Sequence, residues 1–290
     1  MGLLTLFPRV VFLLGLSRPT GLTLSITIKN KSTLILFMEN KFYIYQNFPC
    51  KMNISTIRFS RKDPAQFFST LNKRINEYFK ENKLKKTGDW RLYLKTAIMF
   101  ALFLTPYFLL LTLDLPNWIN LLLTVVMGIG MAGVGMNVMH DGNHGSYSNK
   151  KWINKFMGGT IYILAGNVYN WQVQHNVLHH TYTNIPNHDE DLEAGRILRF
   201  SEHAKWYRYH KFQQYYSVIL YGLLTFNWAI TTDFQQMYRY MKRKLSYGNL
   251  PSPAINWSTL VISKLLYITI WIVLPLIFMD IAWWKVLLGF

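Results

Sequence analysis

A long stretch without charge is the feature of this sequence that most restricts its fold. From Thr96 to Met139 the chain carries no Lys, Arg, Glu or His and a single acid, Asp114. Apolar runs at residues 97–113 and 118–139 lie on either side of that acid. A bilayer core about 30 Å thick is crossed by about 20 helical residues. The stretch therefore predicts a tight helical hairpin through a membrane.

Further apolar runs extend this pattern. Residues 257–279 are also long enough to cross, and we expect Lys264, near one end, to extend its ammonium group to the membrane interface. Residues 281–290 correspond to about 15 Å of helix, and we expect them to start another span. The run at 215–230 is shorter, so we expect an interfacial helix, with a short or tilted span as the alternative. The predicted fold is all-α, an integral-membrane helical bundle that crosses the bilayer several times.

Basic residues lie beside the apolar runs. Residues 61–95 hold ten Lys or Arg, and by the positive-inside rule such flanks place the open ends of the hairpin in the cytoplasm. Residues 64–87 combine apolar residues at three- and four-residue spacing with Lys and Arg on the other side. This pattern predicts an amphipathic helix on a membrane surface or on its own domain.

The net charge of +17 could also indicate nucleic-acid binding. The basic residues border apolar runs, however, and no zinc-finger, RNP or helix-turn-helix pattern presents them to bases. We therefore expect the lipid bilayer as the partner of these charges, and no nucleic acid.

The first residues of the chain differ from the rest. Residues 3–16 are apolar, but they lack the basic start and the small-residue cleavage site of a signal peptide. Met52 is a second possible start, so we expect residues 1–51 to be a non-native or disordered extension. The expected domains are this extension, a basic amphipathic cytoplasmic segment at residues 52–95, and a membrane domain at residues 96–290.

Five of the eight histidines fall between positions 140 and 180. Helical residues four apart are separated by about 40°, so His140 and His144 can address one metal ion, and His175 and His179 repeat that geometry. His180 points about 100° away from His179, towards a neighbouring metal ion or a carboxylate. A lone histidine is more simply a hydrogen-bonded structural residue, but five at this paired spacing indicate a metal site.

The number of histidines favours two metal ions. Imidazole suits zinc, copper, iron and nickel, and five histidines exceed the four ligands of a single zinc. A membrane zinc hydrolase is the alternative, although such enzymes have Glu after the first His of HxxxH, where this chain has Asp141. We expect Asp141, His188 and Asp189 to orient ligand imidazoles through hydrogen bonds, with a solvated acidic turn as the alternative for residues 189–193. The bundle is thus expected to carry a histidine-rich metal-binding cap on its cytoplasmic side.

These segments resemble a known family. Residues 137–148, which contain HDGNH, resemble the first histidine box of the membrane fatty acid desaturases. Residues 171–184 contain HNVLHH and resemble the second box, HxxxHH. The following HDEDL, residues 188–192, is similar to the acyl-CoA, linoleoyl-type or front-end branch. The similarity covers about residues 52–290.

The resemblance implies an activity and its cofactors. Members of the family bind two iron ions between histidine boxes at the cytoplasmic face, use O2, and leave a cis double bond in a CoA- or lipid-linked fatty acyl chain. Two electrons come from an external donor, cytochrome b5 or a ferredoxin. The implied iron ligands, which are also the implied catalytic residues, are His140, His144, His175, His179 and His180.

The chain departs from the family pattern after the second box. The family has a third box, HxxHH or QxxHH, but no histidine follows His210, and His188, His203 and His210 lack its spacing. An HPGG motif is absent as well, so we expect no fused cytochrome b5 domain. We therefore expect a chain truncated before the third box, with impaired iron binding and activity. A non-catalytic remnant and a related membrane di-iron hydroxylase are the alternative functions.

Overall fold

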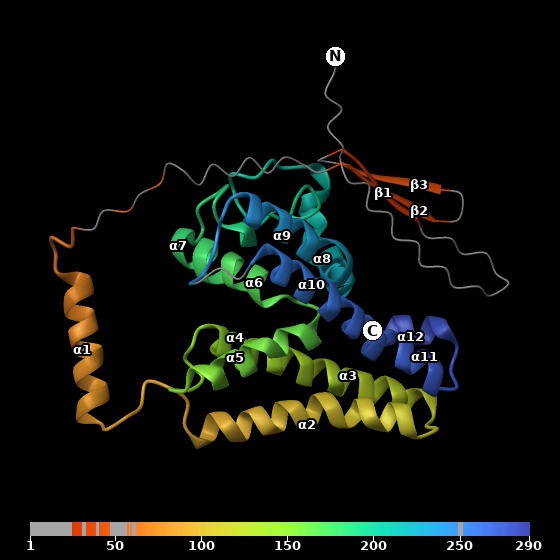
Figure 1. Cartoon of the computed structure of the whole chain (residues 1–290), viewed down its shortest axis with the longest axis horizontal. Helices are drawn as coiled ribbons and strands as arrows, with labels where there is room; N and C mark the ends of the chain where they lie inside the picture. The colour runs from red at the N-terminus through yellow and green to blue at the C-terminus, as the bar shows by residue number, and fades with distance from the viewer. Residues whose placement is uncertain are drawn as a thin grey trace, which may run out of the picture. The chain divides into compact units, whose positions relative to one another are not determined.

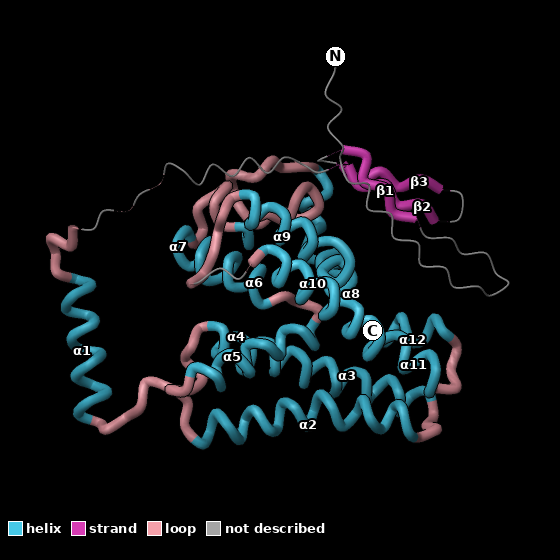
Figure 2. Tube along the Cα trace, viewed as in Figure 1, coloured by secondary structure: helices cyan, strands magenta, loops and turns pink. Residues whose placement is uncertain are grey.

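The computed structural model describes residues 25–30, 33–38, 41–46, 57, 59, 62–248 and 252–290. The chain divides into two units, Met1–Met52 and Asn53–Phe290. The first unit contains the antiparallel strands β1 (Ser25–Asn30), β2 (Thr33–Met38) and β3 (Lys41–Gln46), paired in that order (Figure 2). The predicted non-native or disordered extension, residues 1–51, falls largely outside the described residues and stays a prediction.

The helices of the second unit are joined by loops and turns, and no strand occurs among its described residues. The prediction of an all-α fold is confirmed for this unit (Figure 1). Its α-helices are α1 (Phe67–Glu81), α2 (Trp90–Thr112), α3 (Asn117–Gly133), α4 (His140–Asn143), α5 (Lys151–Gly159), α6 (Val168–Trp171), α7 (His180–Tyr182), α8 (Gln213–Asn227), α9 (Asp233–Lys242), α10 (Pro253–Ile268), α11 (Leu274–Phe278) and α12 (Trp283–Gly289). Short π-helical segments join some of them at Val134–Met139, Gln172–His179, Trp228–Thr232 and Thr269–Val273, and 3-10 turns occupy Thr160–Leu164, Glu190–Leu192 and Arg208–Phe212.

Among the described residues, three continuous helices are long and apolar enough to cross a membrane: Trp90–Thr112, Asn117–Asn143 and Pro253–Phe278. They contain or overlap the three predicted spans. Further along the chain, α12 lies within residues 281–290, where the start of another span is expected. Helix α8 is not among the three, and none of its residues is buried. Its assignment as an interfacial helix stays a prediction.

The hairpin of α2 and α3 packs closely, and the two helices run side by side in Figure 1. Asp89 starts α2 by accepting a hydrogen bond from the backbone N–H of Arg91 at 2.9 Å. In α3, Gly130 lies so near α2 that a Cβ atom there would be 2.4 Å from the backbone nitrogen of Phe103. Phe103 in turn stacks on Trp271, with ring centroids 4.9 Å apart. These contacts join the hairpin to the third long helix.

The structure corrects the expectation for Lys264. Its side chain does not extend to an interface: the residue is 4% exposed and pairs with Asp233 of α9. The ammonium group also donates to the backbone carbonyls of Ala165 and Trp228. A buried carboxylate and two carbonyl oxygens within reach satisfy the charge inside the protein, so the side chain has no need to extend to water.

Candidate metal centre

The five histidines lie on two segments, the first with His140 and His144 and the second with His175, His179 and His180. Each segment contains or follows a π-helical stretch. The first follows the π-helical segment Val134–Met139, so that His140 and His144 lie at the end of the second long helix. The second lies on the π-helical segment Gln172–His179, which runs on into α7. Such segments are rare and occur frequently at functional sites.

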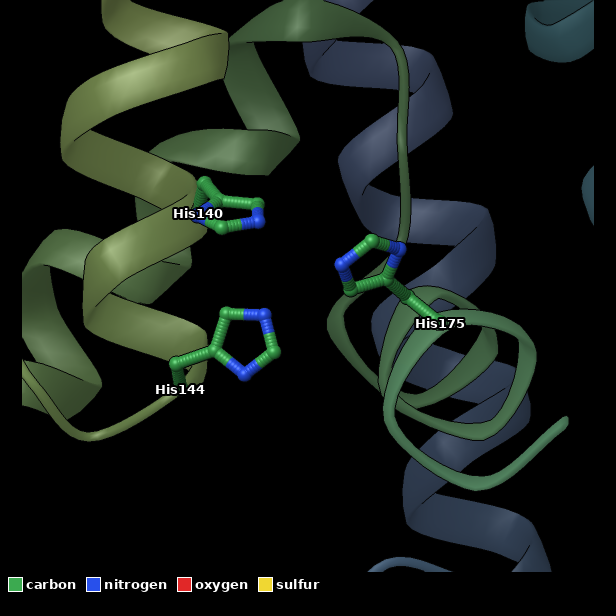
Figure 3. Close-up of side chains that lie close together, drawn as sticks. All are labelled: His140, His144 and His175. Atoms are coloured by element: carbon green, nitrogen blue, oxygen red, sulfur yellow. The ribbon is translucent and has the colours of Figure 1, made fainter. Parts of the chain in front are cut away.

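Imidazoles from the two segments converge. The ring centroids of His140 and His144 are 4.5 Å apart, and the ring of His175 lies 5.2 Å from the first and 5.1 Å from the second. Figure 3 shows the three rings around a common space, with His175 reaching it from the other segment. One nitrogen atom of each lies within 4.8 Å of the others, close enough for one metal ion to bind all three.

The π-helical winding changes the expected direction of His180. In an α-helix, His180 would point away from the side that carries His175, but a π-helix brings residues five apart into register. The Nε2 atoms of His175 and His180 are accordingly 3.2 Å apart. The ring of His180 also lies 4.9 Å from that of His144. His180 therefore joins the cluster, and the α-helical spacing assumed from the sequence was wrong here.

His179 stacks on His175 at 5.4 Å but turns its Nδ1 atom towards carboxylates. This atom lies 3.1 Å from both oxygens of Asp189 and 3.1 Å from Asp191. Asp189 is fully buried, and it also accepts the backbone N–H groups of Asn184 at 2.9 Å and of Asp191 at 3.1 Å. Because a carboxylate only accepts hydrogen bonds, the Nδ1 atom of His179 carries a proton, and Nε2 is the ring nitrogen that points away from these carboxylates.

The other two residues expected to orient imidazoles differ from each other. The Oδ1 atom of Asp141 lies 3.2 Å from the Nδ1 atom of His140, and both side chains are partly exposed. His188 is buried instead against Tyr182, at 5.2 Å between ring centroids, with its Nδ1 atom 3.2 Å from the carbonyl oxygen of Pro186. Asp141 is thus placed to orient an imidazole, whereas His188 contacts Tyr182 at the end of α7 and the carbonyl group of Pro186.

Amide side chains join the two segments, and sequence reasoning missed them. Asn143, inside the first cluster, is buried and donates to the backbone oxygens of Met139 at 3.1 Å and Gly158 at 3.0 Å. Its own Oδ1 atom accepts a hydrogen bond from Gln172 at 3.0 Å, and Asn176 donates to its backbone oxygen at 3.2 Å. The signal in the sequence was the presence of Asn and Gln within both histidine motifs.

Helix α9 supports the second segment through a chain of hydrogen bonds. Gln236 of α9 donates to Gln174 at 2.7 Å, and Gln174 donates to Asp191, also at 2.7 Å. Arg239 of the same helix pairs with Glu190 at 3.1 Å. Hydrogen bonds from the histidine segment and from α9 therefore hold the acidic turn, although Asp191 and Glu193 remain exposed.

The imidazoles at the centre are uncharged at neutral pH. Burial, followed by repulsion from the neighbouring histidines, lowers the pKa of His175 to about 4. Burial and the charge of His140 also lower the pKa of His144. Neutral imidazoles have lone pairs available for a metal ion, since no proton has to leave first.

The metal-free protein should lose stability as the pH falls from 6.5, the ordinary pKa of histidine, to about 4, that of His175 in the fold. In this window the unfolded chain binds a proton at His175 and the folded chain does not, so the free energy of unfolding rises with pH. Urea unfolding of the chelator-treated protein in detergent, inside and above the window, measures this. His175→Asn should weaken the dependence and His203→Asn, at an exposed site, should not. The same dependence in His175→Asn and the wild type would contradict the assignment.

Comparison with known proteins places these segments in context. The model of the family described as "Fatty acid desaturase" matches residues 116–290. The chain is 33% identical over 211 residues to the sn-1 linoleoyl-lipid 6-desaturase of Arthrospira platensis, covering 72% of this chain and 56% of the relative. It is 33% identical over 174 residues to the protein of the same name from Synechocystis, covering 60% and 48%.

A more distant relative is the acyl-lipid (8-3)-desaturase of Physcomitrium patens, 28% identical over 188 residues, which cover 63% of this chain and 39% of the relative. The chain thus spans about half the length of the curated relatives it matches. No solved structure matches the chain significantly.

Proposed function

Because the chain belongs to the fatty acid desaturase family, we propose that it forms the histidine-rich part of a membrane enzyme that introduces a cis double bond into a fatty acyl chain with O2. The metal site would face the cytoplasm of a multi-pass protein and receive electrons from an external donor, cytochrome b5 or a ferredoxin. The proposed ligands of two iron ions are the five clustered histidines, His140, His144, His175, His179 and His180.

The convergence of imidazoles from two separate segments is the observation that carries this proposal. Three rings share one space, His180 reaches the same space, and burial keeps His175 neutral. Imidazole donors suit iron, and five of them from two segments exceed the four ligands of a single zinc, which supports a pair of metal ions. Bound iron would supply the oxygen chemistry that removes hydrogen from an unactivated carbon chain.

The residues around the cluster would fix how each imidazole binds. Asp189 accepts the Nδ1 proton of His179, which leaves Nε2 as the atom that faces a metal ion. Asp141 is placed to do the same for His140. Such hydrogen bonds hold the tautomer and the ring orientation of a ligand.

A hollow beside the third long helix supports an acyl substrate. An apolar groove of about 310 Å³ lies between α10 and the turn Thr160–Leu164, with Ile163, Ile262 and Leu266 in its wall. A second, more polar hollow shares Tyr162 and Thr259 with it and extends to Gln172, which bonds to Asn143 of the first cluster. An acyl chain in the groove could therefore extend towards the metal-binding segments.

The test is the product formed by the expressed chain. The names of two relatives suggest a linoleoyl lipid as the first substrate, so the chain is produced in a host that makes no polyunsaturated fatty acids, supplied with linoleate. Gas chromatography with mass spectrometry should detect a fatty acid with one more double bond, and the purified chain should contain iron. A hydroxylated product would indicate a hydroxylase instead. Absence of both the product and the metal would support a non-catalytic remnant.

A further inference from the structure

Helix α1 carries an apolar side that nothing in the described part of the chain covers. No residue of α1 is buried, and Phe67, Phe68 and Tyr78 are 70%, 67% and 57% exposed. With Leu71 and Ile75, which are also exposed, they follow one another at the spacing of a single helical face. Isolated exposed apolar residues are ordinary, but a continuous face of large ones marks a surface that binds something.

The helix does not depend on packing for its start. The carboxylate of Asp63 accepts hydrogen bonds from the backbone N–H groups of Phe67 at 2.9 Å, Phe68 at 3.0 Å and Ser69 at 3.1 Å. Those bonds satisfy three of the four donors that a helix leaves free at its first turn. These bonds stabilise the first turn of α1, which lowers the cost of ordering the helix on binding.

The charge around this face is positive. The basic residues of the helix are Lys73, Arg74 and Lys80, which lie away from the apolar side or at its edge. They outnumber its two acids, Glu77 and Glu81. Three more lysines, Lys83, Lys85 and Lys86, follow within the next residues. A basic helix with a wide apolar face suits the surface of a membrane that contains anionic lipids, because those lipids attract Lys and Arg close to the surface.

The position of α1 in the chain keeps it near such a surface. Residues 82–89 connect it to α2, the first of the three candidate spans, and can extend no more than about 30 Å. At the start of that span, Trp90 is exposed, and the guanidinium group of Arg91 lies 5.8 Å from its ring centroid. Tryptophan and arginine at the end of a span are typical of the membrane–water interface.

We propose that α1 lies in the plane of the membrane surface, with its aromatic face in the headgroup region and its basic residues against anionic lipid headgroups. A protein partner is less suitable, because an excess of lysine is unusual at the centre of protein interfaces. The proposal does not depend on desaturation. It assigns to α1 an anchoring surface separate from the histidine cluster.

Spin labels on the full chain, reconstituted in bilayers, test this. In a Cys50→Ser background, which removes the single native cysteine, a label is placed at Ile75→Cys on the apolar face or at Asn76→Cys on the other side. In bilayers of mixed phosphatidylcholine and phosphatidylglycerol, the label at position 75 should lie about 5–10 Å deep and collide with O2 more than with a water-soluble nickel chelate. The label at position 76 should show the reverse.

Three results would overturn the proposal. Equal collision with the nickel chelate at both positions would place α1 in water. A label at position 75 that neither reagent reaches would place the face against protein. An equal depth in bilayers of phosphatidylcholine alone would remove the role of anionic headgroups, since the depth should decrease there.

Discussion

Replacing His175 with alanine should remove bound metal from the purified protein. The His175 ring lies within 5.4 Å of the centroids of all four other clustered histidines, so its loss opens the site where the two segments meet. Changes to residues that only orient a ligand cost about 10–100-fold in metal affinity, and loss of a central ligand should exceed that range. Elemental analysis of the protein and titration of the metal-free protein with ferrous iron measure the effect.

Two further variants distinguish binding from orientation. Asp189→Asn keeps the size of the side chain but weakens its bond to His179, and should reduce the affinity by about 10–100-fold. His203→Ala, at an exposed position outside the cluster, should leave the affinity unchanged, and circular dichroism should report the same helix content in all three variants. Metal retained in His175→Ala at the level of the wild type would rule out the proposed site.

Much of the fold follows from local patterns. The three long helices coincide with the three apolar runs because burial in a bilayer requires an uninterrupted apolar helix, which a sequence displays directly. The candidate cluster was also visible, since His140 and His144 are neighbours on any helix and HNVLHH repeats the spacing. The direction in which each ring points was harder to predict from the sequence. His180 joins His175 only because the helix is π-wound there, and no residue type in that segment signals the extra residue in the turn.

Contacts between distant segments could not be predicted in the same way. Gln236 and Arg239 of α9 support the acidic turn through Gln174 and Glu190, but α9 carries no motif and lies more than forty residues further along the chain. Lys264 was misassigned for the same reason. A lysine near the end of a span normally reaches water, and only the fold brings Asp233 beside it.

Replacing Lys264 with methionine should strongly destabilise the protein. Both members of the pair are buried, and Asp233 accepts one further side-chain hydrogen bond, from Asn170 at 2.9 Å. Removal of one partner leaves a buried charge without compensation, which typically costs about 3–5 kcal/mol. Urea unfolding of the protein in detergent micelles measures this cost. Lys285→Met, which removes an exposed bond to Asn117 and a contact with the Trp284 ring at 5.7 Å, should change stability by no more than about 1 kcal/mol.

The titration of Asp233, the partner of Lys264, distinguishes an uncompensated charge from a packing effect. Burial raises the pKa of Asp233, against the opposing effect of Lys264, so without the lysine the carboxyl group should keep its proton to a higher pH still. Because the pKa is raised in the folded state, the free energy of unfolding falls as the pH rises above 3.8, the ordinary pKa of the carboxyl group. Lys264→Met should therefore be least stable at alkaline pH. Adding Asp233→Asn removes the charge, retains the acceptor for Asn170, and should recover most of the loss at alkaline pH, where the carboxyl group is ionised. A double variant no more stable than Lys264→Met would show that packing, and not the uncompensated charge, causes the effect.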